Sequence, residues 1–185
     1  MAIVVRPLTP KRWTDLEAVL GGRGCSLARR CGCMYYRRSG SFRPGQENLA
    51  ALRALVEAGV VPGLIAYRDG VAVGWVSLGP RTEYARLKRS PVMKAVDERP
   101  VWSIVCFVVP SPYRGQGVAR ALLRGAIAYA RKRGARLLEA YPVDKPDRSA
   151  DESMWFGAGS MFEASGFEEV ARRKPTRPIV RLKLD

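Results

Sequence analysis

The sequence contains no histidine among its 185 residues. Histidine is the usual general base near neutral pH and the commonest zinc ligand, so its absence removes both from the chemistry of this chain.

Long apolar runs are also missing. No run approaches the roughly 20 residues that a membrane-spanning helix needs. The first thirteen residues hold only a short apolar run before Arg6, which does not fit a signal peptide. We therefore expect a cytoplasmic protein with no membrane segment.

Cysteine is sparse, and its pattern does not favour a metal site. The chain has four cysteines, which we expect to be reduced because no secretory signal precedes them. Cys25, Cys31 and Cys33 lack the paired C-x-x-C spacing of a zinc site, and only the distant Cys106 could be a fourth ligand. We weigh a metal site as the alternative and predict small buried thiols.

Acidic residues are outnumbered: 17 Asp and Glu stand against 32 Lys and Arg, which gives a formal net charge of +15. Such a charge attracts nucleic acid, ribosomes and anionic small molecules. The basic residues are scattered along the chain, and no nucleic-acid-binding motif accompanies them. We therefore interpret the charge as an arginine-rich surface that attracts phosphates, and do not expect nucleic acid as a partner.

The most informative stretch runs from residue 101 to residue 141. Residues 101–109 are uncharged and rich in β-branched and aromatic side chains, which predicts a buried strand that ends at Pro110. An amphipathic helix is predicted from Val118 to the C′ glycine Gly134, and a second strand over residues 137–141. Strand, helix and strand together predict a βαβ unit.

A glycine-rich loop, RGQGVA over residues 114–119, leads into that helix. The unpaired N–H groups of a helix N-terminus form an anion site, and Gly115 and Gly117 let a phosphate approach without a Cβ in the way. Arg114 and Arg120 add charge at the rim. The loop is neither a P-loop nor a dinucleotide fingerprint, since Arg120 stands at the third glycine position. An ordinary tight turn is the alternative reading.

The loop matches R-x-x-G-x-A, with Val109 five residues before its arginine. This resembles the acetyl-CoA signature of the GNAT superfamily of N-acetyltransferases. The resemblance implies that the loop amides hold the CoA pyrophosphate, and that Phe107 and Val109 contact the pantetheine arm. The implied cofactor-binding residues are Phe107, Val109, Arg114, Gly115, Gln116, Gly117, Val118, Ala119 and Arg120.

Two further segments resemble the same superfamily. Residues 66–75 (AYRDGVAVGW) resemble its central hairpin, with a bulge or close approach at Gly74, and residues 161–167 (MFEASGF) its last-helix motif. The resemblance implies an α/β fold with a mixed, mostly antiparallel central sheet, a splayed parallel βαβ core and flanking helices. We expect one GNAT-like domain over residues 1–185. Residues 31–36 and 102–109 resemble an uncharacterised bacterial branch of the superfamily.

The remaining elements follow from local patterns. We expect strands at residues 3–5, 167–173 and 179–184, a hairpin at 64–78, and helices at 10–20, 46–58, 83–94 and 154–164. Residues 22–45 are expected to be a loop, and the 83–94 helix to lie beside the mouth of the pocket. Pro175 and Pro178 are expected in the turn between the last two strands.

The usual catalytic pair of the superfamily is missing. Its members often carry an acidic residue where this chain has Val105 or Ser103, and a proton-donating tyrosine where it has Phe162. Tyr141 and Ser160 are the candidate catalytic substitutes, and each also has an ordinary structural reading. The general acid and base are therefore left open.

The segment between the first two helices often shapes the acceptor pocket in this superfamily. We predict that Tyr35 and Tyr36 line that pocket, with Arg37 or Arg38 facing an anionic group of the acceptor. The alternative is that these aromatic residues only pack the loop onto the core.

The resemblance implies an acetyl-CoA-dependent N-acetyltransferase that moves an acetyl group directly to a primary amine of a small molecule or a protein. The expected partners are acetyl-CoA and the amine, and the expected assembly is a monomer or homodimer. A non-catalytic CoA-binding sensor or interaction module is the first alternative, because the usual acid and base are absent. A basic nucleic-acid- or ribosome-binding protein is the second.

Overall fold

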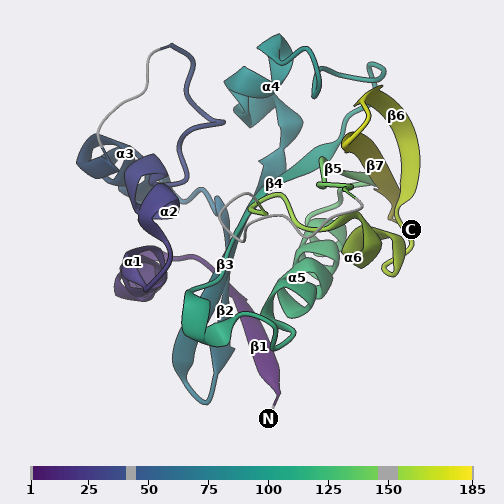
Figure 1. Cartoon of the computed structure of the whole chain (residues 1–185). Coiled ribbons are helices and arrows are strands. Elements are labelled where there is room, and N and C mark those ends of the chain that lie inside the picture. Colours follow the sequence, from purple (N-terminus) through teal and green to yellow (C-terminus); the bar gives the residue numbers. More distant parts are fainter. Residues whose placement is uncertain (1, 41–44, 146–153, 185) are drawn as a thin grey trace.

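The computed structural model describes residues 2–40, 45–145 and 154–184. Its centre is a seven-stranded sheet in the order β1-β2-β3-β4-β5-β7-β6 (Figure 1). All neighbouring strands are antiparallel except β4 and β5, which are parallel. The strands are β1 (Ile3–Pro7), β2 (Gly63–Arg68), β3 (Val71–Pro80), β4 (Trp102–Val108), β5 (Leu137–Ala140), β6 (Glu168–Lys174) and β7 (Arg177–Lys183). The predicted mixed α/β fold is confirmed.

The β2–β3 hairpin turns at Asp69 and Gly70, both with positive φ, at 49° and 79°. This left-handed pair is what a two-residue hairpin turn requires, and it confirms the hairpin that the sequence predicts. Opposite β2, the register steps from Gly74 to Ala72 and leaves Val73 without a partner, so the predicted bulge is present.

Helix α5 (Val118–Lys132) crosses between β4 and β5 and packs on one face of the sheet, with the short α6 (Gly159–Glu163) beside it (Figure 1). Its buried side chains recur at helical spacing, as the sequence predicts. They are Val118, Ala121, Leu122, Leu123, Ala126 and Ala130. Gly134 follows the helix with φ 76°, as expected of a C′ glycine.

The opposite face is covered by α1 (Trp13–Gly21), α2 (Ser26–Cys31) and α3 (Gly45–Glu57) (Figure 1). The prediction of a continuous loop over residues 22–45 is wrong, because α2 lies within it. This helix buries none of its six residues completely, so no apolar stripe announces it. A left-handed glycine, Gly32, ends it.

Three other local predictions need correction. The helix expected over 83–94 is a 3₁₀ helix, η2 (Arg81–Glu83), followed by the short α4 (Ala85–Arg89). Its Tyr84 and Leu87 are fully buried, so the segment anchors in the core and is not confined to the mouth of the pocket. The helix expected over 154–164 is reduced to α6, since Gly157 has a φ of 80° that a helix does not accept. Pro178 lies within β7, opposite Arg172.

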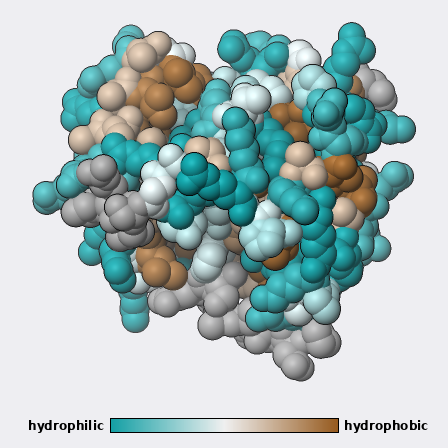
Figure 2. Space-filling view, turned by 90° about the horizontal axis from the view of Figure 1, so that it is seen from above, coloured by the Kyte–Doolittle hydropathy of each residue, from teal (hydrophilic) through white to brown (hydrophobic). Residues whose placement is uncertain are grey.

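No helix in the described ranges is long and apolar enough to cross a membrane. Seen from above, the surface is mostly hydrophilic, with separate hydrophobic clusters rather than one continuous apolar face (Figure 2). This view agrees with the high content of charged residues in the sequence.

Replacing Gly74 with alanine tests the close approach of β3 and α5. The new methyl carbon would lie 2.7 Å from Val118 Cγ1 and 3.1 Å from Leu122 Cδ1, both in α5. The helix would have to move away from the sheet, so we expect the free energy of unfolding to fall by about 1–3 kcal/mol. Urea unfolding followed by circular dichroism measures the change.

Gly21→Ala is the matched control, because an added Cβ there meets nothing within 4 Å. We expect its stability to stay within about 0.5 kcal/mol of wild type. Equal stabilities of the two variants would contradict the close packing of β3 on α5.

Candidate functional site

A cavity of about 790 Å³ opens where β4 and β5 part. Their parallel ladder ends at the pair Ile104 and Ala140. The cavity walls come from the end of β4, the glycine-rich loop, the α2 region and the segment before α6. The carboxyl end of β4 and the N-terminus of α5 therefore meet at one hollow, the usual kind of place for a ligand in α/β sheets.

Gly115 and Gly117 form the part of the wall beside the N-terminus of α5. Their φ angles are 70° and 81°, which other residues reach only with strain. A Cβ added at either glycine would meet nothing within 4 Å, so each faces open space. The first-turn amides of a helix have no intrahelical partner, and the helix dipole is positive at this end. The geometry fits the predicted cradle for a diphosphate, with Val118, Ala119 and Arg120 also in the wall.

Arg114 lines the cavity, but its guanidinium is hydrogen-bonded to backbone carbonyls of two neighbouring segments. Its Nε donates to the carbonyl of Val109 at 3.0 Å, and its Nη2 donates to the carbonyl of Gly24 at 2.7 Å. It therefore fastens the end of β4 to the loop between α1 and α2.

Gln116 does not line the cavity. Its amide donates to the carbonyl of Pro112 at 2.6 Å, and its side-chain oxygen accepts a hydrogen bond from Arg68 of the β2–β3 hairpin. Gln116 shapes the loop from outside, so the structure separates it from the other predicted cofactor residues.

Phe107 and Val109 both line the cavity, as the sequence predicts for residues beside the pantetheine arm. The N–H of Phe107 donates to the carbonyl of Trp155 at 2.6 Å. The same segment also contacts the chain just after β5, since the Val143 N–H donates to the Gly157 carbonyl at 2.9 Å. The segment before α6 thus bridges the two strands where they diverge.

Tyr35, Tyr36 and Ser160 also line the cavity. The two tyrosine rings meet edge to face with centroids 5.0 Å apart. The Tyr36 ring also packs against the Phe156 ring, with centroids 5.5 Å apart. Burial raises the pKa of Tyr36 above its ordinary value, so its phenol stays protonated. Arg37, by contrast, does not line the cavity but pairs with Glu83.

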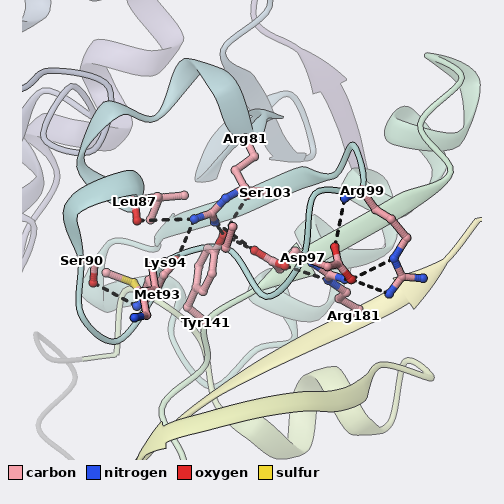
Figure 3. A network of polar contacts seen from close by, with 12 residues as sticks. Arg81, Leu87, Ser90, Met93, Lys94, Asp97, Arg99, Ser103, Tyr141 and Arg181 are labelled. Carbon is pink, nitrogen blue, oxygen red and sulfur yellow. Dashed lines mark hydrogen bonds and ion pairs between the residues drawn. The ribbon is translucent and has the colours of Figure 1, made fainter.

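Tyr141 is not brought to the cavity. Its hydroxyl donates to Glu139 at 2.6 Å and lies 2.9 Å from Ser103 Oγ, inside a buried polar network (Figure 3). Burial and the Glu139 carboxylate raise its pKa well above the ordinary value. In this position the Tyr141 hydroxyl connects the two parallel strands, through Ser103 in β4 and Glu139 in β5.

Glu139 is the centre of that network and is completely buried. It accepts hydrogen bonds from Arg81 at 3.0 Å and from Arg181 at 2.8 Å, and Arg181 also pairs with Asp97 at 2.7 Å. The Arg181 and Arg99 guanidiniums hold the pKa of Asp97 well below its usual range. The cluster joins β5, β7, η2 and the segment before β4.

All four cysteines line the cavity, three from residues 25–33 and the fourth from β4. They are Cys25, Cys31, Cys33 and Cys106, and all are free thiols. Within the described part of the chain, no group of three or more potential metal ligands comes together. The run of cysteines before Tyr35 is a sequence signal for this wall, but nothing local links it to Cys106.

Comparison with known proteins gives a consistent result. The sequence model of the acetyltransferase (GNAT) family matches residues 33–152. No curated protein matches the chain.

Solved structures extend the likeness over nearly the whole chain. Ribosomal-protein-alanine N-acetyltransferase from Brucella melitensis has a TM-score of 0.58 at 19% identity, covering 98% of this chain and 99% of its own. The Salmonella typhimurium protein yncA, solved with its cofactor acetyl-CoA, gives 0.57 at 17%, with 100% and 95% covered. PaiA N-acetyltransferase from Thermoplasma acidophilum, in complex with coenzyme A, gives 0.54 at 15%, with 99% of each covered. At these identities the likeness shows the fold alone.

The buried network predicts a sharp difference between two glutamate substitutions. Glu139→Gln would leave the guanidiniums of Arg81 and Arg181 without their shared carboxylate. We expect it to lower the free energy of unfolding by about 3–5 kcal/mol, since breaking a buried ion pair leaves uncompensated charge. Urea unfolding measures the loss.

Glu57→Gln is the control, because Glu57 pairs with Arg53 at 3.0 Å on an exposed face of α3. We expect a change of about 0.5 kcal/mol or less. A similarly small effect of Glu139→Gln would show that the buried network does not hold the strands together.

Proposed function

Because the chain belongs to the acetyltransferase (GNAT) family, we propose that it transfers an acetyl group from acetyl-CoA directly to a primary amine. Acetyl-CoA is the cosubstrate, and the fold is that of acetyltransferases solved with acetyl-CoA and coenzyme A. We further propose that residues 1–185 act as one domain, because strands from both ends of the chain join one sheet.

The observation that carries the proposal is the open loop at the N-terminus of α5. Two left-handed glycines, Gly115 and Gly117, face empty space on the wall of the cavity. A diphosphate here would meet backbone N–H donors and the positive end of a fifteen-residue helix. Arg120 adds charge from the same wall.

The strand before the loop would orient the rest of the cosubstrate. Val109 and Phe107 line the cavity between the loop and the segment before α6. The N–H of Phe107 is a backbone donor, and the Trp155 carbonyl that now accepts from it would have to yield for a ligand to pair there. The thioester supplies an already activated acetyl group, so holding it beside the amine provides much of the acceleration.

The acceptor side of the cavity is aromatic and apolar. Tyr35, Tyr36 and Trp155 line it, which favours an amine attached to an apolar or flat group. A protein N-terminus is the alternative acceptor, since one structural relative is a ribosomal-protein-alanine N-acetyltransferase. For the departing thiolate, we propose Ser160 as the hydrogen-bond donor, because this residue lines the cavity while Phe162 has no proton to give.

Calorimetric titration of acetyl-CoA into wild type and Gly117→Trp tests the loop. We expect micromolar binding to wild type, and at least a hundredfold loss in the variant because the indole fills the space for the diphosphate. Gly134→Trp is the matched control, since Gly134 is also left-handed, faces open space and follows the other end of α5. Failure of wild type to bind would reject the proposed function.

Turnover is measured as release of free thiol with tyramine, spermidine and an alanine-initiated peptide. Thiol release with at least one amine is the expected result. Binding of acetyl-CoA without release in any of the three would favour the non-catalytic sensor instead.

A further inference from the structure

The exposed side of α5 carries charge of one sign only. The chain has no Asp or Glu from Arg99 to Leu138, a stretch that includes the whole helix. The sequence alone favours no nucleic-acid partner, because its basic residues look scattered and no motif accompanies them. The fold nevertheless collects six exposed cations on α5 and just after it. We call them the α5 stripe: Arg120, Arg124, Arg131, Lys132, Arg133 and Arg136.

The α5 stripe is a row along the axis of the helix. Arg124 and Arg131 lie four and eleven residues after Arg120, close to one and three full turns, so the three side chains share one side of α5. At a rise of about 1.5 Å per residue, this row is roughly 16 Å long. The other three members extend it at the C-terminal end. The opposite side of the helix packs on the sheet, so the row faces solvent (Figure 1).

The fold itself does not use these six side chains. Within residues 2–40, 45–145 and 154–184, none of them forms an ion pair or a side-chain hydrogen bond. Several other arginines are engaged inside the structure. Arg81 and Arg181 pair with Glu139, and Arg114 donates to two backbone carbonyls. The charges of the α5 stripe are therefore available to an external partner.

The stability of the helix does not explain the α5 stripe. Like charges four residues apart repel each other on a helix, as Arg120 and Arg124 do, and a mixture of both signs would be more stable. Arg120 also lies in the first turn of α5, where the positive end of the helix dipole disfavours a cation. A row of one sign that opposes its own helix is expected where an anionic partner neutralises it.

The chemistry of the α5 stripe selects among anionic partners. Most of its members are arginines, whose planar guanidinium binds a phosphate through two hydrogen bonds. In α5, all of which the structure describes, the exposed residues include no large apolar side chain that would insert into a lipid surface. Tyr129 packs against Trp102 with ring centroids 6.1 Å apart, so this ring does not offer a stacking platform for bases. Contact with a phosphate backbone, without reading of the bases, fits these features.

We propose that the α5 stripe binds the phosphate backbone of a nucleic-acid duplex without reading its sequence. This inference is independent of the proposed acetyl transfer. A duplex carries one negative charge per about 1.7 Å of its axis, so a row of roughly 16 Å meets several phosphates. Since Arg120 also lines the cavity, the row ends at the phosphate-binding end of the acetyl-CoA site.

Fluorescence anisotropy with labelled RNA and DNA duplexes of one sequence tests the proposal. Wild type should bind, and its affinity should fall about a hundredfold between about 50 and 200 mM salt, as expected for about four phosphate contacts. Tighter binding of the RNA duplex would identify RNA as the source of the phosphates. Equal binding would indicate backbone contacts that both duplexes provide.

The double substitution Arg124→Gln and Arg131→Gln removes two charges from the α5 stripe and keeps good helix formers. Neither residue lines the cavity, so acetyl-CoA binding should not change. We expect the affinity for a duplex to fall about fiftyfold at about 0.1 M salt, and the slope of log affinity against log salt to drop by about two. The matched control is Lys88→Gln with Arg89→Gln, since both residues are exposed on α4 and the net charge changes equally. Its slope should keep the wild-type value.

Failure of wild type to bind either duplex would overturn the proposal. Equal losses in the two double variants would also overturn it, because binding would then follow net charge rather than the α5 stripe. Vesicles of anionic phospholipid and polyglutamate are the competing anions, and wild-type binding to either as tight as to the duplexes would reject the choice of a nucleic-acid backbone. Thermal unfolding checks that each variant is folded. Loss of acetyl-CoA binding in wild type would reject the proposed function and leave the duplex result unaffected.

Discussion

The parallel ladder between β4 and β5 is three residue pairs long, and the position where it stops creates the cavity. After Ala140 the chain runs into Tyr141 and Pro142. Proline has no N–H to continue a ladder, and the Tyr141 ring is held by Glu139 in the buried network. The two strands therefore part, and the end of β4 faces the opening. Because α5 connects these same strands, its N-terminus lies at the mouth of the opening rather than elsewhere on the sheet (Figure 1).

The buried charges give this opening a fixed frame. A carboxylate inside a protein is stable only when cations and hydrogen-bond donors replace the water that it lost. Glu139 accepts hydrogen bonds from Arg81 in η2, from Arg181 in β7 and from the phenol of Tyr141. Since these partners come from separate elements, a shift of one strand relative to another would leave a buried charge without its partner. The network thus positions the site although it does not line it.

The sequence predicts the parts of this molecule whose signals are local. The strand and helix of residues 101–134 follow from apolar periodicity, and the loop between them follows from its glycines. All three are present in the structure, with Gly115 and Gly117 at positive φ. The short α2 escapes prediction because none of its residues is fully buried. Tyr84 lies in a charged stretch of sequence that suggests a surface position. Its side chain is nevertheless buried, and its hydroxyl accepts a hydrogen bond from the Arg37 guanidinium. Such a position depends on a partner far along the chain.

The thiols show the same division at the site itself. An apolar strand around Cys106 argues for an inert buried thiol, and that argument uses only its neighbours in sequence. The reactivity of a thiol depends instead on what surrounds the sulfur in space. The antiparallel pairing of β3 with β4 brings Trp75 beside that strand, and the left-handed turn after α2 adds Cys33. Three segments, none informative alone, thus bring Cys33 and Cys106 to the same cavity wall.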